Sequence, residues 1–463
     1  METMFRNYDE AIKLLGIPSH VETAVAFDRT CLLFSLHPSR SKLAVAAAGK
    51  VCILTQRKHA KDTLSSPETW TAPCTVTSIC WTAFPRAGSQ SDDCCLLVGT
   101  TDGFLHLVSA EAEELQSQRV HDSPLLRIRC RTAGMGADPL YFLEDVTVVS
   151  ENAVMRVSGI ELLSVLRGHR VGGWSATDAP DLTVTKWRLP KQVGPRSDAF
   201  CAGAKPRGLY DVLSDGAEPR AVSIHSAGSS PALASIDAPE GEPSSTAPPR
   251  GPIARALGGG SGASGVASAL GSAYRSAAAL KGVYDAARSR IAVAAAEGRG
   301  EPTPAGGPCR LWRSLDDPKR SATSLMPSPS GGLLVATDNL GRILLLDAPT
   351  FTALRIWKGY RDAACGWTDL PPSEGGGGSG ALCLVLHAPR KSVVELWEVR
   401  SGRRRCAFRC DNGCRLLMPE PPLGGAAGGD PALGSARPPG CCMLEPSGRL
   451  VDVGEHARAA LGL

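Results

Sequence analysis

One glycine-rich run, Gly260-Ser261-Gly262-Ala263-Ser264-Gly265, has the G-x-G-x-x-G spacing of dinucleotide-binding turns. Such a turn binds a pyrophosphate because a hydrophobic strand precedes it and aims its backbone N–H groups at the ligand. The preceding residues, Arg255-Ala256-Leu257-Gly258, do not form such a strand, so we interpret the run as a flexible hinge. The sequence also contains no Gly-x4-Gly-Lys-Ser/Thr loop. We therefore predict no cofactor and no nucleotide-hydrolysis site.

A second set of residues with chemical potential is a group of cysteines: Cys406, Cys410 and Cys414, with Cys441 and Cys442 downstream. Zinc sites usually pair cysteines at short spacing on knuckles, whereas these gaps fall across a predicted strand and turn. We expect these thiols to be buried as small apolar groups and predict no metal site. The nine histidines are scattered and show no arrangement typical of nucleophilic catalysis. No catalytic residues are predicted.

Aromatic and charged side chains concentrate in one short segment. Its members are Trp357, Lys358, Gly359, Tyr360, Arg361, Asp362 and Trp367. One interpretation is a closing strand whose aromatic rings fill the space between neighbouring sheets, with Arg361 and Asp362 paired in the loop. The other is a partner-binding rim, because loops on a rigid scaffold often carry recognition. Chemistry alone favours the first interpretation and leaves the second open.

The elements that position this segment form a predicted β-meander. Leu333–Asp338, Arg342–Asp347 and Thr352–Lys358 read as strands, and Asn339-Leu340-Gly341 and Ala348-Pro349-Thr350 read as the turns between them. The middle strand is apolar at successive positions, which is typical of a strand covered on both faces. Further sheets must therefore pack on each side of this meander.

The same pattern of strand, turn and strand recurs along the chain. Clear units begin near Phe34, Cys94, Leu140, Leu333, Ala381 and Cys441, with weaker strands near Val184 and Ala221. About seven units at spacings of roughly 40–50 residues match the blades of a β-propeller. We therefore predict an all-β, WD40-like propeller. Its repeats are loose, because no Gly-His to Trp-Asp pair marks each unit. A pair of β-sandwiches is the structural alternative.

The composition divides the chain into four parts. We predict an N-terminal lead-in at residues 1–33, with a short helix over Asn7–Gly16. The first propeller part covers residues 34–237 and the last part covers residues 309–463, and a low-complexity insertion at residues 238–308 separates them. Within the insertion, Val266–Glu297 has the spacing of an amphipathic helix on flexible linkers. Such a helix could dock on the propeller, enter a partner's groove or lie on a membrane surface.

The net charge and the lack of long apolar segments exclude several classes of function. The chain has 50 basic and 46 acidic residues among 463, a net charge of +4, which argues against a nucleic-acid partner. No apolar run reaches transmembrane length, and the first twenty residues lack the apolar core of a secretory signal. We therefore expect a cytoplasmic protein in which the 16 cysteines are reduced.

The segment NLGRILLLDAPTFTALRIWKGYRDAACGW, from Asn339 to Trp367, resembles the N-terminal domain of the regulatory, non-catalytic subunit of the Rab-three GTPase-activating protein. Its most specific part runs from Trp357 to Ala363, followed by Trp367. Other stretches resemble this family in the same order: CCLLVGTTDGFLHLV from Cys94, SPLLRIRCRT from Ser123, Leu140–Arg167, TKWRL from Thr185, HAPRKSVVELWEV from His387 and GCRLLMP from Gly413.

This resemblance implies a regulatory scaffold whose partners are a separate catalytic subunit and Rab-family GTPases, without a small-molecule substrate. It also implies a role in membrane traffic, in nucleotide exchange on the endoplasmic-reticulum Rab-eighteen and in autophagy. Peripheral contact of this cytoplasmic protein with endoplasmic-reticulum or vesicle membranes stays open. Family members continue into a long helical C-terminal half, so we expect either a fragment or a reduced relative. The functional alternatives are a generic trafficking scaffold that binds no Rab and, less favoured, a propeller enzyme.

Overall fold

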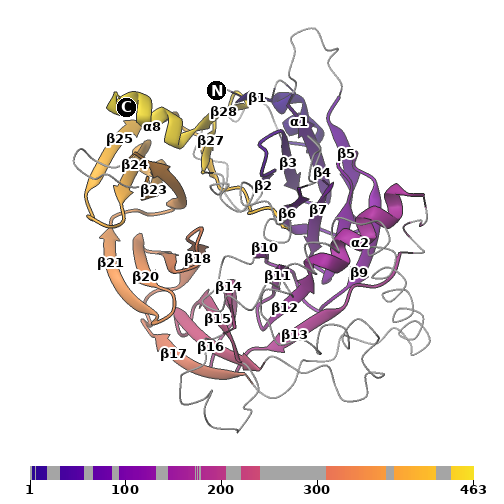
Figure 1. Ribbon diagram of the computed structural model, residues 1–463, viewed down its shortest axis with the longest axis horizontal. Coiled ribbons are helices and arrows are strands. Elements are labelled where there is room, and N and C mark those ends of the chain that lie inside the picture. The colour runs from indigo at the N-terminus through magenta and orange to yellow at the C-terminus, as the bar shows by residue number, and fades with distance from the viewer. Residues whose placement is uncertain are drawn as a thin grey trace, which may run out of the picture.

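The computed structural model describes residues 3–5, 7–17, 32–56, 66–85, 93–131, 144–172, 174, 176, 179–204, 221–239, 309–371, 380–423 and 440–462. Within them, the strands form seven four-stranded antiparallel sheets around a common axis (Figure 1). The predicted all-β propeller of about seven blades is therefore confirmed. We number the blades from 1 to 7 in chain order, starting at β2.

Each blade contains four strands, and at every junction other than that between blades 5 and 6 the first strand of a blade contacts the first strand of the next. Blades 1 to 3 are β2 (Leu33–Leu36), β3 (Lys42–Ala47), β4 (Lys50–Thr55) and β5 (Glu68–Thr71); β6 (Val76–Phe84), β7 (Asp93–Thr100), β8 (Phe104–Val108) and β9 (Glu114–Arg119); and β10 (Arg127–Arg131), β11 (Asp145–Val149), β12 (Ala153–Ser158) and β13 (Val184–Arg188). Blades 4 and 5 are β14 (Arg196–Ala204), β15 (Ala221–Gly228), β16 (Leu233–Pro239) and β17 (Arg310–Leu315); and β18 (Ala322–Pro327), β19 (Leu333–Asp338), β20 (Arg342–Asp347) and β21 (Thr352–Lys358). Blades 6 and 7 are β22 (Ala364–Leu370), β23 (Ala381–Ala388), β24 (Val393–Glu398) and β25 (Arg404–Arg409); and β26 (Arg415–Leu417), β27 (Cys442–Leu444), β28 (Arg449–Asp452) and β1 (Thr3–Met4).

The N-terminal residues close the ring. Strand β1 pairs antiparallel with β28, so both ends of the chain build blade 7 (Figure 1). The backbone N–H of Phe5 continues this contact by donating to Gly448 O at 2.9 Å, and the Phe5 ring is buried. Helix α1 (Tyr8–Leu14) follows and packs against blade 1. The segment interpreted as a lead-in thus contributes a strand, which two residues are too few to reveal by alternation.

The core lies between the blades, in seven apolar clusters that each join two neighbours. Strand β20 shows how the sequence produces this arrangement. Ile343 and Leu345 face blade 6, whereas Leu344 and Leu346 face blade 4. Because successive side chains of a strand point to opposite faces, a middle strand covered on both sides must be apolar throughout. The prediction that β20 is covered on both faces is confirmed.

An ion pair near the axis ties three blades together. Arg129 on β10 donates to both carboxylate oxygens of Asp198 on β14, at 3.2 and 2.5 Å. Asp198 Oδ2 also accepts the Leu325 N–H of β18 at 2.8 Å, and Arg129 donates to the Leu325 carbonyl. All three residues are buried. Buried charges are tolerated when paired and hydrogen-bonded, so this network holds blades 3, 4 and 5 in register.

The segment after β26 crosses from blade 7 to blades 2 and 3. Glu420 Oε2 accepts the Cys130 N–H at 3.0 Å, and the Leu423 N–H donates to Ala83 O at 2.8 Å. The Leu423 side chain is fully buried in the cluster between blades 2 and 3. Asp198 and Glu420 are therefore both engaged by arginine and backbone donors.

Two further helices follow third strands of their blades: α2 (Gly159–Arg170) follows β12, and α8 (Val453–Leu461) follows β28. A short 3-10 helix (Pro389–Lys391) forms the turn between β23 and β24. Strands β16 and β17 pair although residues 240–309 separate them, which places the insertion inside blade 4. The predicted helix Val266–Glu297 and its linkers lie outside the described residues. Among the helices described, none has the length and apolarity needed to span a bilayer.

Candidate functional site

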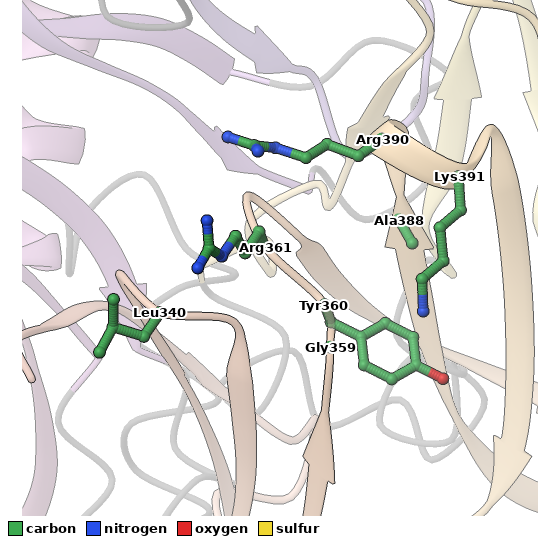
Figure 2. A pocket seen from close by; sticks show the side chains of 7 residues that line it. All are labelled: Leu340, Gly359, Tyr360, Arg361, Ala388, Arg390 and Lys391. Carbon is green, nitrogen blue, oxygen red and sulfur yellow. The ribbon is translucent and has the colours of Figure 1, made fainter.

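Three loops meet on one face between blades 5 and 6. They are the β19–β20 turn, the β21–β22 loop that joins the blades, and the β23–β24 turn. Since strands alternate in direction, turns between second and third strands lie at the same end as the loops between blades. These loops enclose a pocket of about 430 Å³, whose lining is shown in Figure 2: Leu340, Gly359, Tyr360, Arg361, Ala388, Arg390 and Lys391.

The β19–β20 turn is shaped by an aspartate and a glycine. Asp338 Oδ1 accepts the backbone N–H groups of Leu340 at 3.0 Å and Arg342 at 2.7 Å, which is the local pairing that aspartate favours in turns. Gly341 follows with φ at +86°, a conformation that glycine adopts at little cost. A Cβ on Gly341 would lie 2.7 Å from the Arg361 backbone nitrogen, so glycine also lets the β21–β22 loop approach.

Tyr360 fixes the β21–β22 loop through both its backbone and its side chain. Its backbone N–H donates to Gly341 O at 2.9 Å, and its phenol donates to Glu395 Oε2 at 2.6 Å. Glu395 also accepts from Trp397 Nε1 at 3.0 Å and Arg404 Nη1 at 2.9 Å. Burial alone would raise the pKa of Glu395, but these three donors outweigh it and lower the pKa. Burial, reinforced by the Glu395 carboxylate, raises the pKa of Tyr360 above its usual value.

The pocket lining contains three cations and no carboxylate. Lys391 Nζ lies 4.5 Å from the centre of the Tyr360 ring, within the range of a cation–π contact. Arg390 Nε donates to Asp362 Oδ2 at 2.6 Å, at the rim. Arg361 makes no ion pair within the part of the chain that the structure describes. Figure 2 shows Arg361 and Arg390 extending to the same side, with Lys391 beside the Tyr360 ring.

The structure separates the predicted site residues into two groups. Gly359, Tyr360 and Arg361 line the pocket, and Lys358 and Asp362 are exposed beside it. The two tryptophans belong to the core instead: Trp357 and Trp367 are buried in the cluster between blades 5 and 6, together with Ile343, Leu345, Leu384 and Leu386. The tryptophans therefore fill the space between blades, as the first interpretation of this segment expected, and the polar loop between them reaches the surface. The pairing of Arg361 with Asp362 that this interpretation also expected is wrong, because Asp362 accepts from Arg390 instead.

Sequence reasoning missed Leu340, Ala388, Arg390 and Lys391 as members of this site. The run Pro389-Arg390-Lys391 is recognisable as a turn, but nothing in its own sequence places it beside Tyr360. The signal lay in the topology, because the turns between second and third strands of neighbouring blades flank the loop that joins them. Once strands are assigned to blades, the three loops can be brought together without coordinates.

The cysteine group packs in the apolar interior, with Cys406 and Cys410 at its edge. Cys406, Cys410, Cys414 and Cys441 belong to the cluster between blades 6 and 7, and Cys442 is buried toward blade 1. Burial raises the pKa of Cys414 to about 12, so its thiol stays protonated at neutral pH. All 15 cysteines in the described residues are free thiols. Across the same residues, no three His, Cys, Asp or Glu side chains are grouped to hold a metal ion.

The chain is similar to two solved structures over most of its length and to one named relative over a short stretch. The crystal structure of Saccharomyces cerevisiae Sqt1 aligns with 90% of this chain and 82% of its own, at a TM-score of 0.40 and 11% sequence identity. The crystal structure of the WD40 β-propeller domain of Doa1 aligns with 80% of this chain and 79% of its own, at a TM-score of 0.37 and 11% sequence identity. A Rab3 GTPase-activating protein regulatory subunit from Caenorhabditis elegans is 33% identical over 95 residues, which cover 20% of this chain and only 7% of that relative's length.

The family match is much longer and includes the pocket. It begins just before β2 and ends at the last residue of β26, so it covers the first six blades and the first strand of the seventh. Over residues 30–417, the sequence matches the family described as the Rab3 GTPase-activating protein regulatory subunit N-terminus, and the chain belongs to that family.

Proposed function

We propose that this chain is a non-catalytic scaffold that regulates Rab-family GTPases together with a separate catalytic subunit. The observation that carries the proposal is the family match over residues 30–417, since the family is that of a regulatory subunit. A rigid propeller that presents short loops suits such a role, because its loops offer surfaces for several partners at once. We place its action in membrane traffic, on the cytoplasmic side of endoplasmic-reticulum or vesicle membranes.

The fold supports a binding role for the loops between blades 5 and 6. Tyr360 is held by Gly341 and Glu395, so the loop is ordered before any partner arrives. Preorganised loops lose little conformational entropy on binding, which favours specific recognition. Arg361 and Lys391 are exposed on this ordered surface and are available to a partner. We propose that this face takes part in assembly of the complex.

Affinity purification of the full chain from its own cells tests the proposal. We expect a catalytic GTPase-activating subunit to be recovered in near-equal amount, and GTP hydrolysis by a Rab GTPase to be faster with both subunits than with the catalytic one alone. Recovery of a folded, monomeric chain without that subunit would contradict the proposal. Recovery of trafficking proteins with no change in Rab GTP hydrolysis would favour a generic scaffold.

A further inference from the structure

The pocket between blades 5 and 6 has the features of a site for a negatively charged ligand. Arg361 is exposed, has no ion-pair partner among the described residues and lies close against Gly341, which accepts the N–H of the preceding residue, Tyr360, at 2.9 Å. A guanidinium presents a planar set of donors that matches a carboxylate or phosphate in two parallel hydrogen bonds. Arg361 is therefore the group in this pocket with unused capacity to bind an anion.

The two other cations are already anchored within the protein. Lys391 is held over the Tyr360 ring at 4.5 Å, and Arg390 is held by Asp362 at 2.6 Å. Anchored cations cost less conformational entropy when a ligand arrives, and their positive charge still acts on it. Because Asp362 offsets part of the charge of Arg390, the site suits a singly charged group better than one with several negative charges.

The rim of the pocket also offers an apolar surface. Leu340 is 41% exposed at the tip of the β19–β20 turn, next to the loop that carries Arg361. Ala388 lies buried in the lining, and the Tyr360 ring adds an aromatic surface. A ligand that combines a carboxylate with a neighbouring apolar side chain would use all three features. The pocket, at about 430 Å³, is within the size range of specific ligand sites.

We propose that this pocket binds a short acidic peptide segment of a partner protein. A Glu or Asp side chain of the segment pairs with Arg361, Lys391 and Arg390 add attraction, and an adjacent apolar side chain packs on Leu340. A lipid headgroup fits less well, since membrane-binding surfaces usually gather more basic residues than these three. The proposal goes beyond the regulatory role, because it names the ligand chemistry of one pocket and does not depend on assembly with a catalytic subunit.

The test measures binding of a short fluorescein-labelled peptide of alternating Leu and Glu to the purified full chain. Fluorescence anisotropy of the peptide reports the binding. A peptide with Gln in place of Glu controls for charge. The variant Arg361→Gln removes the unpaired cation, and Lys391→Met removes a second charge while keeping an apolar stem. Arg403→Gln is the matched control, because Arg403 is an exposed arginine in the β24–β25 turn at the other end of blade 6. Vesicles of phosphatidylcholine with phosphoinositides, tested by flotation, represent the lipid alternative.

We expect the Glu peptide to bind more tightly than the Gln peptide. Arg361→Gln should weaken binding roughly tenfold or more, since a charge-assisted pair is lost, whereas Arg403→Gln should change it little. Lys391→Met should give a smaller loss. Equal binding of both peptides, or no effect of Arg361→Gln in a protein that still unfolds cooperatively, would overturn the proposal. Binding to phosphoinositide vesicles without binding to the peptide would also overturn it, in favour of a headgroup site.

Discussion

The phenol of Tyr360 donates a 2.6 Å hydrogen bond to Glu395 Oε2, which joins the loop between blades 5 and 6 to the third strand of blade 6. Glu395 is only 8% exposed and receives two further donors, Trp397 and Arg404. A buried carboxylate that loses one donor keeps its desolvation cost without full compensation. Tyr360 therefore couples the shape of the pocket to the interior of blade 6.

Replacement of Tyr360 by Phe should lower the free energy of unfolding by about 1–2 kcal/mol, since a hydrogen bond to a charged, buried acceptor is lost. Urea unfolding followed by circular dichroism measures this change. A double-mutant cycle with Glu395→Gln, which keeps an acceptor but removes its charge, measures the part of the Tyr360–Glu395 coupling that depends on the charge. If Tyr360→Phe left stability unchanged, the bond would have no role in fixing the loop.

Trp367 and Arg361 should respond in opposite ways to substitution, although both stand in the same predicted segment. Trp367 is fully buried between blades 5 and 6, so Trp367→Ala should destabilise the protein by about 3–5 kcal/mol through the cavity it creates. Arg361→Ala should change stability by less than about 0.5 kcal/mol, because the side chain is exposed and unpaired. Thermal unfolding of the two variants tests this division. Similar losses in both would contradict it.

The sequence predicts the blades well where local signals agree with the fold. Strands β19, β20 and β21 have the bounds predicted for the meander, because apolar runs alternate with turns built from Asn339, Gly341 and Pro349. Helix α2 is not among the elements predicted from the sequence. Gly168 lies near its end, and glycine lowers helix propensity, yet a Cβ there would lie 2.3 Å from the Trp174 ring. Tertiary packing, which the local sequence does not display, selects that glycine.

The candidate site was predictable only in part, because it combines local and non-local residues. Tyr360 and Arg361 stand in a segment whose composition is unusual, so composition alone singled them out. Lys391 and Leu340 come from turns with ordinary sequences, and only the pairing of strands brings them to the same pocket. The same holds for Thr3–Met4, which forms a strand because β28 lies at the other end of the chain.

His37 should make stability depend on pH. It is 3% exposed, and burial, with a smaller effect from Lys42, lowers its pKa from 6.5 to about 4. Its Nδ1 accepts the Ser39 N–H at 3.2 Å, a bond that the protonated ring cannot accept. The unfolded chain therefore binds a proton more readily than the folded one, so stability falls as the pH drops from 6.5 toward 4.

His37→Asn keeps an acceptor for Ser39 and removes the titration. Between neutral pH and pH 5, the wild-type protein should lose about 2 kcal/mol more of its unfolding free energy than this variant loses. Urea unfolding at a series of pH values measures both slopes. Parallel slopes for the two proteins would show that His37 is not responsible.

Phe5 should be the anchor that keeps the ring closed. Strand β1 makes only two residue pairs with β28, Thr3 with Leu450 and Met4 with Arg449, so its hydrogen bonds alone supply little stability. The ring of Phe5 is 1% exposed in the cluster between blades 7 and 1, and Phe5→Ala should cost about 3–5 kcal/mol. Met4→Ala is the matched control, because Met4 is 51% exposed and its removal should cost less than about 0.5 kcal/mol.

Loss of Phe5 should also release β1, which leaves β28 as an unpaired edge. Hydrogen exchange of the β28 amides in the folded Phe5→Ala protein measures that release directly, and we expect faster exchange there than in blade 3, on the other side of the ring. Uniform protection of β28 in the Phe5→Ala protein would mean that the two backbone pairs close the propeller without the aromatic anchor.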